Sequence, residues 1–269
     1  MTSGYQIVVC GGLVPDPLQT LEPVSTPNGP ALKNEMMLPV ALDPWAGHAL
    51  YEAAHLAKQI PGSKVWLVSL GAKPKLQQLM MSVAQKAAFE FVPVEGNAGG
   101  FMSAYDCAAA LTAAIKGIAG LDMTRLLLFG GWESASRGAG STLQLIGESL
   151  GIMDQFMGVD EIKPQADGSF TVLERVEGAR HQESLCQGAP AVLGWATGSL
   201  PEPMNNPQIG MMNMRSIMPA LQRAPKANVA LDGIEYASVE LPKQQRDTRI
   251  VKDLSVEQIA QEIVDWIKQ

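Results

Sequence analysis

The stretch GGWESASRGAGST, residues 130–142, carries the residue types best suited to hold a small charged ligand. Four of its thirteen residues are Gly and four are Ser or Thr, and it directly follows the apolar run RLLLF. Small residues let a backbone approach a ligand closely. Backbone N–H groups and hydroxyls at a helix N-terminus suit an anion such as a phosphate. A second interpretation stays open, in which this is a tight strand-to-helix turn with Ser141 or Thr142 as a simple helix cap.

The same loop lacks the residues of bond-breaking chemistry. It has no Lys and no GxxxxGK[ST] pattern, so it does not predict ordinary nucleotide hydrolysis, and it contains no GxGxxG. No His stands in an obvious position to activate Ser134, Ser136 or Ser141 as a nucleophile. We therefore expect a binding loop and no catalytic residue.

Metal chemistry is also not expected. The three Cys residues (Cys10, Cys107 and Cys186) show no CxxC or zinc-ligand spacing, and the chain has only three His. Free thiols in a reducing cytoplasm are the plain interpretation.

Composition limits the classes of function. Of the 269 residues, 46% are hydrophobic and 17% are charged, which allows an extensive core. The net charge of −7 leaves no basic patch for nucleic acid. The longest apolar stretches fall short of the roughly 20 residues that a membrane helix needs. The N-terminal residues enter a strand almost at once, so we expect no signal peptide and a cytoplasmic protein.

Strand and helix signals alternate along most of the chain. Apolar runs predict buried parallel strands, and helical spacing of apolar residues predicts the helices between them. Asp43 is a predicted N-cap, with Pro44 at the first helical position. This succession predicts a doubly wound, mostly parallel sheet, with ligands beyond the carboxyl ends of its strands. A strand and its Gly-Gly turn are expected within 5–14. Further strands are expected at 64–71, 89–94, 124–131 and 190–197, and helices at 43–60, 73–88, 103–118 and 141–151.

The last third of the chain departs from this alternation. Residues 169–186 predict an antiparallel hairpin on the sheet edge. Residues 198–230, rich in Pro and Met, are expected to be largely loop and short helix. Their Met residues are either core filling or a flexible docking surface, and the loop composition favours docking. We expect a nucleotide-binding domain over 1–228, with a recognition loop at about 200–218. A C-terminal arm over 229–269 is expected to end in an amphipathic helix that docks either on the body of this chain or on a partner chain, and we expect the partner.

Five stretches, in their order and spacing, together resemble the β subunit of the electron transfer flavoproteins over nearly the whole chain. IVVCGGLVPD is similar to the first strand and Val-Pro-Asp turn of that family, with a glycine in place of the usual Lys. Asp43 stands where the family carries Asn before its Pro-aromatic helix start. Residues 126–151 lie at the place of the nucleotide-phosphate loop. LPEPMNNPQIGMMNMRS resembles the recognition loop, and residues 241–267 resemble the closing Pro/Arg segment and terminal helix.

The resemblance implies an adenine nucleotide α-hydrolase-like fold and a heterodimer with a larger α subunit that holds the redox FAD. The β subunit buries a nucleotide, AMP in most members and a second FAD in flavin-bifurcating ones. It also docks a flavin-containing dehydrogenase and breaks no covalent bond itself. We expect AMP here, with FAD as the alternative. A stand-alone adenine-nucleotide-binding protein of the stress-protein type is a second alternative, which the Met-rich loop and the terminal helix disfavour.

Carried over by position, the resemblance also names site residues. The backbone of Cys10 would line the adenine side, and Asp43 and Leu70 would close the pocket. Gly138 and Gly140 would permit close backbone approach. The residues expected to contact the phosphate are the hydroxyl pair Ser141 and Thr142, and Ser136. Arg137 departs from the family pattern, and its side chain either neutralises a phosphate or points to solvent.

Two departures bear on the ligand and on the partner. The acidic run usual in the phosphate loop is replaced by ESAS and an Arg, which favours a diphosphate over a monophosphate. Gln208 stands where members that dock acyl-CoA dehydrogenases carry an anchoring Leu. The apolar anchor would instead come from Ile209, Met211 and Met212, which implies another dehydrogenase or a changed contact.

Overall fold

A large α/β unit, Met1–Val239, and a short C-terminal unit, Glu240–Gln269, make up the chain. The computed structural model describes residues 4–27, 29–96, 101–136, 140–227, 237–240, 248 and 250–268. The expected domain boundary after residue 228 falls in a stretch outside the described residues.

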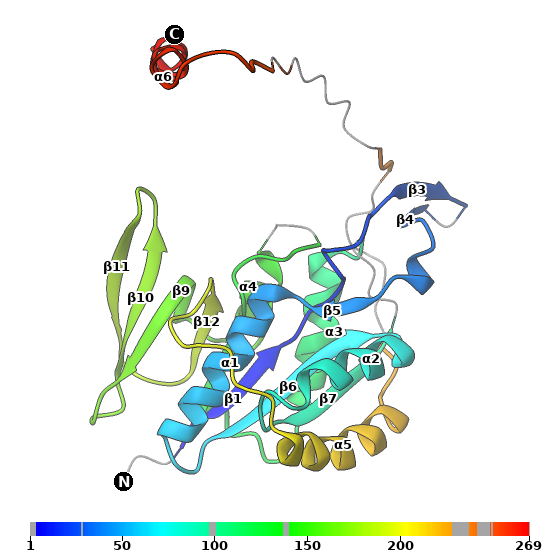
Figure 1. The fold of residues 1–269 in the computed structure, drawn as a ribbon. Helices are drawn as coiled ribbons and strands as arrows, with labels where there is room; N and C mark the ends of the chain where they lie inside the picture. The colour runs from blue at the N-terminus through cyan, green and yellow to red at the C-terminus, as the bar shows by residue number, and fades with distance from the viewer. Residues whose placement is uncertain are drawn as a thin grey trace. The chain divides into compact units, whose positions relative to one another are not determined.

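An eight-stranded sheet forms the centre of the large unit (Figure 1). Its order is β11-β10-β9-β12-β8-β1-β6-β7, and the pairs from β9 to β7 are all parallel. This confirms the expected mostly parallel α/β sheet. The strands are β1 (Gln6–Cys10), β6 (Lys64–Gly71), β7 (Glu90–Glu95), β8 (Leu126–Gly131), β9 (Gln155–Pro164), β10 (Phe170–Val176), β11 (Arg180–Cys186) and β12 (Ala191–Trp195).

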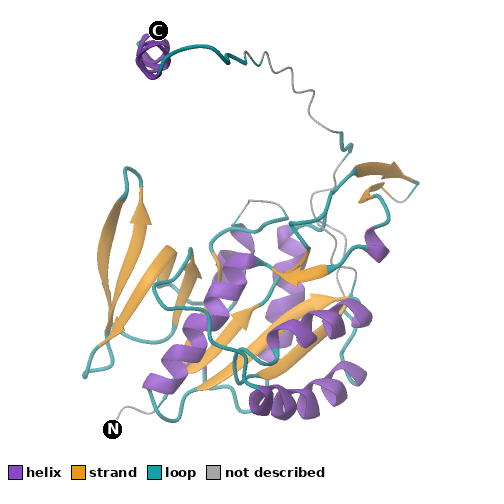
Figure 2. Ribbon diagram, in the orientation of Figure 1, coloured by secondary structure: helices purple, strands orange, loops and turns teal. Residues whose placement is uncertain are grey.

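Helices cover both faces of the sheet, because successive strand residues point to opposite sides. On one face, Ile7, Val9 and Leu67 pack with α1, α2 and α5. On the other, Val8, Cys10 and Val68 pack with α3 and α4. Figure 2 shows these two helical layers on either side of the strands. The helices are α1 (Pro44–Gln59), α2 (Lys73–Val83), α3 (Ala104–Lys116), α4 (Ser141–Ser149) and α5 (Pro207–Gln222).

The order of the strands reverses between β1 and β8. From β1 the chain winds outward through β6 to β7, and it then returns to β8 on the other side of β1. Loops at the carboxyl ends of β1 and β8 therefore lead to opposite faces of the sheet and separate there. Such a switch point is where ligands bind in open α/β sheets.

The predicted hairpin is present at the sheet edge as β10 and β11, which pair antiparallel around a turn at 177–179. Strand β9, beside it, was not predicted, since Gly158 and Asp160 interrupt its apolar pattern. Short strands also occupy the segment between β1 and α1, which precedes the cap of α1. They form two small antiparallel pairs, β2 (Leu13–Pro15) with β5 (Val40–Leu42), and β3 (Pro23–Thr26) with β4 (Gly29–Leu32).

One helix prediction was wrong at its end, and one loop prediction was wrong because the segment forms a helix. Helix α2 ends at Val83, although helical signals continue to residue 88. The carbonyl oxygens of Ala84 and Ala87 accept hydrogen bonds from the buried Asn213 side chain of α5, each at 2.7 Å. Helix α5 itself replaces the expected loop and short helix, because Asn206 caps it and Pro207 occupies its first position.

In the C-terminal unit, α6 (Val256–Ile267) forms an amphipathic helix, as predicted. A capping box starts it, in which the Ser255 hydroxyl accepts the Gln258 N–H and the Gln258 side chain accepts the Ser255 N–H. None of its described residues is buried. Its apolar side chains are therefore exposed on the chain taken alone: Val256, Ile259, Ile263, Val264, Trp266 and Ile267.

Candidate functional site

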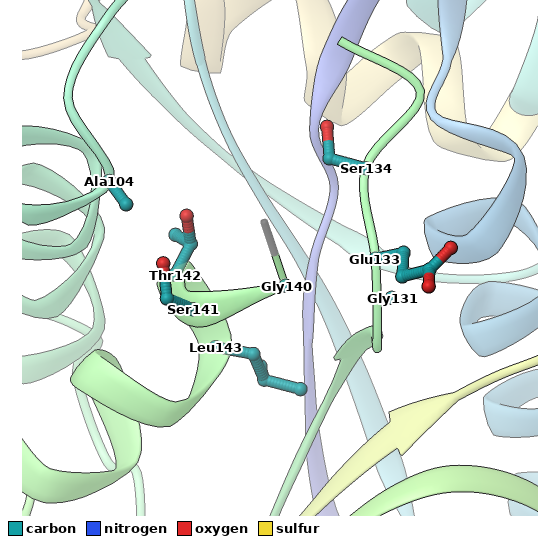
Figure 3. A pocket seen from close by; sticks show the side chains of 8 residues that line it. All are labelled: Ala104, Gly131, Glu133, Ser134, Gly140, Ser141, Thr142 and Leu143. Carbon is teal, nitrogen blue, oxygen red and sulfur yellow. The ribbon is translucent and has the colours of Figure 1, made fainter. Parts of the chain in front are cut away.

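A small cavity lies where the loop after β8 leads into α4. Its volume is about 40 Å³, which exceeds the roughly 10–15 Å³ that one water molecule needs. It therefore has room for one small polar group and not for a whole nucleotide. Figure 3 shows its lining residues, which are Ala104, Gly131, Glu133, Ser134, Gly140, Ser141, Thr142 and Leu143.

Helix α4 presents its N-terminus to this cavity. Its N-cap is Gly140, in the left-handed conformation at φ 62°, and Ser141 and Thr142 are its first two residues. Ser141 and Thr142 are therefore not the cap, and within the described part of the chain no side chain caps this helix. The positive end of the helix dipole and two hydroxyl groups are thus placed where an anion would be stabilised.

The N-terminus of α3 reaches the same cavity through Ala104. Ser103, which is buried, caps this helix by accepting the Tyr105 N–H at 3.2 Å. Helices α3 and α4 pack side by side on one face of the sheet. Two helix N-termini therefore lie at one cavity, and both favour negative charge there.

Gly140 is needed for a reason inside the protein. A Cβ at this position would overlap the carbonyl oxygen of Trp132, so the exit from β8 lies directly against the start of α4. The Trp132 N–H in turn donates to the carbonyl of Trp195 in β12, at 3.1 Å. The loop is thus tied to the sheet on the β12 side.

Asp43 holds the loop after β8 on the side of α1. It is almost fully buried and caps α1, where its Oδ1 accepts the Trp45 N–H at 3.2 Å. Its Oδ2 accepts the N–H of Ala135 at 2.9 Å. Burial raises the pKa of this carboxyl, and hydrogen bonds from Ala135 and Ser134 counteract part of that rise. Asp43 does not line the cavity; it holds the loop that does.

Cys10 and Leu70 also lie at strand ends near this edge, but their side chains belong to the core. Both are buried in the cluster that faces α3 and α4, and neither lines the cavity. Burial raises the pKa of the Cys10 thiol far above its usual range, which keeps it protonated at neutral pH. The adenine role expected for Cys10 concerned its backbone and stays a prediction.

The remaining predicted phosphate contacts divide into two groups. Ser136 is half-buried, and its Oγ lies 2.9 Å from the Oγ of Ser134, outside the cavity lining. Arg137 and Gly138 lie outside the described residues. Of the predicted nucleotide-binding residues, the structure thus brings Gly140, Ser141 and Thr142 together at the cavity.

Some lining residues were not predicted as site residues. Glu133 and Ser134 belong to the Gly-rich loop itself, and the Glu133 carboxylate points away from the Ser141 and Thr142 hydroxyls (Figure 3). Ala104 comes from the strand-helix unit before β8. The alternation of strands and helices could have indicated it, since the carboxyl ends of parallel strands share one edge.

The predicted docking residues lie at the start of α5. Gln208, Met211 and Met212 are exposed, the two Met side chains at 62% and 63%, and Ile209 is half-buried. Met204, just before the helix, is 89% exposed. Gly210 and Asn213 face inward toward α2, so the outer face of α5 is the Met-rich one.

The segment 198–206, which precedes α5, is attached to α1 and to the turn that follows α2. The buried Glu52 accepts the N–H groups of Ser199 and Leu200, each at 2.9 Å. The His55 ring donates to the Pro201 carbonyl at 2.9 Å. Further along, Lys86 pairs with Glu202 at 2.6 Å. The Met-rich surface is therefore presented by a held segment and not by a free loop.

The structure also bears on a possible nucleophile elbow. GESLG, residues 147–151, has the letters of a nucleophile elbow, which requires a sharp strand-to-helix turn. Ser149 lies instead in the last turn of α4, with its hydroxyl bonded to the Leu145 carbonyl.

Among the described residues, no group of three or more His, Cys, Asp or Glu could hold a metal ion. Within the same part of the chain, no helix is long and apolar enough to cross a membrane.

No protein-family model matches the sequence, and no curated protein is significantly similar to it.

Proposed function

We propose that this chain is the β subunit of a heterodimeric, cytoplasmic electron transfer flavoprotein that buries AMP at the carboxyl edge of its sheet. The observation that carries the proposal is the cavity at the switch point, where the N-termini of α3 and α4 lie with the hydroxyls of Ser141 and Thr142. A phosphate group fits this chemistry. The fold would then be the adenine nucleotide α-hydrolase-like variant of the α/β sheet.

The small volume of the cavity is consistent with one phosphate group. The ribose and adenine would lie outside it, along the ends of β1 and β6, where the backbones of Cys10 and Leu70 lie close to the edge. Backbone N–H groups and hydroxyls need no proton transfer to hold a phosphate. The subunit would thus bind a nucleotide without cleaving it, and the nucleotide would stabilise the folded chain because it binds the native state.

Two exposed apolar surfaces support a role that requires partners. The outer face of α5, with Met204, Met211 and Met212, would dock a flavin-containing dehydrogenase. The apolar face of α6, with Ile259, Ile263 and Trp266 exposed, would pack on the FAD-carrying α subunit. Electrons would pass through the flavin of that subunit, and this chain would shape and hold the assembly.

The test is to produce the chain together with its FAD-carrying subunit, denature the purified complex and quantify the released nucleotides by chromatography. One FAD and one AMP per heterodimer is the expected result. Two FAD and no AMP would instead make it a flavin-bifurcating subunit. A nucleotide-bearing monomer without a flavin partner would point to a stand-alone binding protein, and a folded chain without any nucleotide would reject the site.

A paired variant tests the phosphate contact directly. Replacing both Ser141→Ala and Thr142→Ala removes two hydroxyls at the cavity and should weaken AMP binding about tenfold. Calorimetric titration of AMP into the nucleotide-stripped protein measures this. Ser149→Ala, at the other end of α4, is the matched control and should leave the affinity for AMP unchanged, since its hydroxyl bonds within the helix. Equal affinity in all three proteins would place the nucleotide elsewhere.

A further inference from the structure

Asp43 connects three elements that meet at the carboxyl edge of the sheet. Its backbone N–H donates to the Gly12 carbonyl, just after β1, at 2.8 Å. Its Oδ1 caps α1 through the Trp45 N–H. Its Oδ2 reaches across 92 residues of sequence to the Ala135 N–H, in the loop after β8. The side chain is only 3% exposed, so water does not compete effectively for these bonds.

The loop also packs closely against the start of α1. An added Cβ at Gly131 would lie 2.6 Å from the Cβ of Trp45 and 3.4 Å from the backbone nitrogen of Ala46. Gly131 itself and Ser134, three residues further on, both line the cavity. The position of the 131–136 segment is therefore set by α1 on one side and by the Trp132–Trp195 backbone bond on the other.

A carboxylate is the group that can accept the Trp45 and Ala135 N–H groups at once, together with the Ser134 hydroxyl. It offers two acceptor oxygens, one for each N–H. An amide offers one acceptor oxygen and one NH₂ donor. Asn can therefore cap α1, but its NH₂ group would face the N–H of Ala135, donor against donor.

We infer that Asp43 is a positioning residue for the nucleotide site: its carboxylate holds residues 131–136 where Gly131 and Ser134 complete the cavity opposite Ser141 and Thr142, without touching the ligand. This inference rests on the proposed nucleotide site. It assigns Asp43 to the loop and not to the nucleotide. Since the family that this chain resembles carries Asn at this position, the requirement for a second carboxylate oxygen belongs to the loop of this chain, where Oδ2 accepts the Ala135 N–H.

The test uses Asp43→Asn in the complete chain with its FAD-carrying subunit. The cap of α1 is retained and the loop bond is lost, so affinity for AMP should fall about tenfold or more, and the unpaired Ala135 N–H should lower the melting temperature by roughly a few degrees. Asp43→Ser, which can cap the helix but is too short to reach Ala135, should show the same loss. Asp43→Ser also tests the role of the loop bond if Asp43→Asn does not fold.

A matched control is Asp122→Asn. Asp122 also accepts the N–H of the residue two positions on, Thr124, at 3.0 Å, but it lies before β8, at the opposite end of that strand. This variant should keep wild-type affinity for AMP. Loss of affinity in both variants would point to general destabilisation and would overturn the inference.

Hydrogen exchange supplies a readout that does not depend on AMP. In Asp43→Asn, the Ala135 amide should exchange faster, while the first-turn amides of α1 keep their protection. If Asp43→Asn kept both the wild-type protection of the Ala135 amide and the wild-type affinity for AMP, the inference about Asp43 would be overturned and the proposed nucleotide site would stand. A wild-type chain that binds neither AMP nor FAD would instead reject the proposed nucleotide site, and the inference with it.

Discussion

At the residue scale, the residue type at a few positions is determined by one neighbouring group each. Gly140 is the sharpest case, since its φ of 62° and the nearby Trp132 carbonyl both exclude a side chain. Sequence reasoning assigned this glycine to close approach by a ligand. The structure adds a second requirement, which holds even without a ligand.

Gly140→Ala should destabilise the fold by about 3 kcal/mol or more, because it adds a steric overlap to the cost of the left-handed conformation. Gly151→Ala is the matched control at the other end of α4. Its φ is 74°, but nothing lies within 4 Å of the added Cβ, so it should cost only about 1–2 kcal/mol. Urea unfolding of the two variants measures the difference. Equal costs would show that the loop yields to the added Cβ.

Glu52 should make stability depend on pH. Burial raises its pKa from an ordinary value of about 4.5, against hydrogen bonds from Leu200 and Ser199 that lower it. The folded state thus binds the proton more tightly than the unfolded state. The contribution of this group is fully present below about pH 4.5 and is lost as pH rises through the folded pKa.

Glu52→Gln isolates this effect, because both N–H groups bond to a single oxygen that the amide can replace. The free energy of unfolding of the wild type, relative to this variant, should fall as pH rises from 4.5 toward 7. Denaturant titrations at several pH values measure it. Glu52→Ala, which leaves both N–H groups unpaired, should instead cost about 1–3 kcal/mol across the range. A wild-type free energy of unfolding that rises relative to that of Glu52→Gln between pH 4.5 and 7 would contradict the raised pKa.

At the element scale, the end of α2 is decided by α5. Helical propensity and apolar spacing continue past Val83, yet the Asn213 side chain takes two carbonyl oxygens in the turn that follows. The Asn206 N–H takes a third, from Gln85, at 2.9 Å. Three bonds from a distant element thus replace the next helical turn, and no local pattern could have predicted them.

Asn213→Ala should therefore destabilise the packing of α5 on α2 by about 2 kcal/mol, since it leaves two buried carbonyl groups without their donor. Ser216→Ala is the control, because this exposed residue of the same helix should change stability by less than about 0.5 kcal/mol. Thermal unfolding followed by circular dichroism compares them. If Asn213→Ala left the stability unchanged, the turn after Val83 could satisfy its carbonyl groups by extending α2.

At the scale of the whole molecule, the amphipathic helix of the C-terminal unit carries an apolar face that the residues of its own unit do not cover. Its apolar side chains are exposed although its own cap and helical bonds are satisfied. Such a surface is costly in water unless another surface covers it. Under the proposed function, the α subunit supplies that cover.

Replacing Ile259 and Ile263 together with Asp should abolish or strongly weaken the heterodimer, because two charges would be buried at the interface. The unfolding temperature of the isolated chain should not fall, since both side chains are exposed there. Sedimentation of the co-expressed subunits measures association. Gln261→Asp, on the polar face, is the control. An intact heterodimer in the double variant would assign α6 another role.

The sequence by itself determined the repeating strands and helices, the mostly parallel sheet, the cap at Asp43 and Pro44, and the loop at the end of β8. These features depend on residues within a turn or on the period of apolar side chains, so they can be seen locally. The tertiary structure alone decided that Asp43 holds Ala135 and that Ser141 is not a cap. It also decided that α2 ends early and that Cys10 and Leu70 face the core. Each of these depends on hydrogen bonds or packing between segments far apart in the chain, whose partners exist only once the sheet has formed.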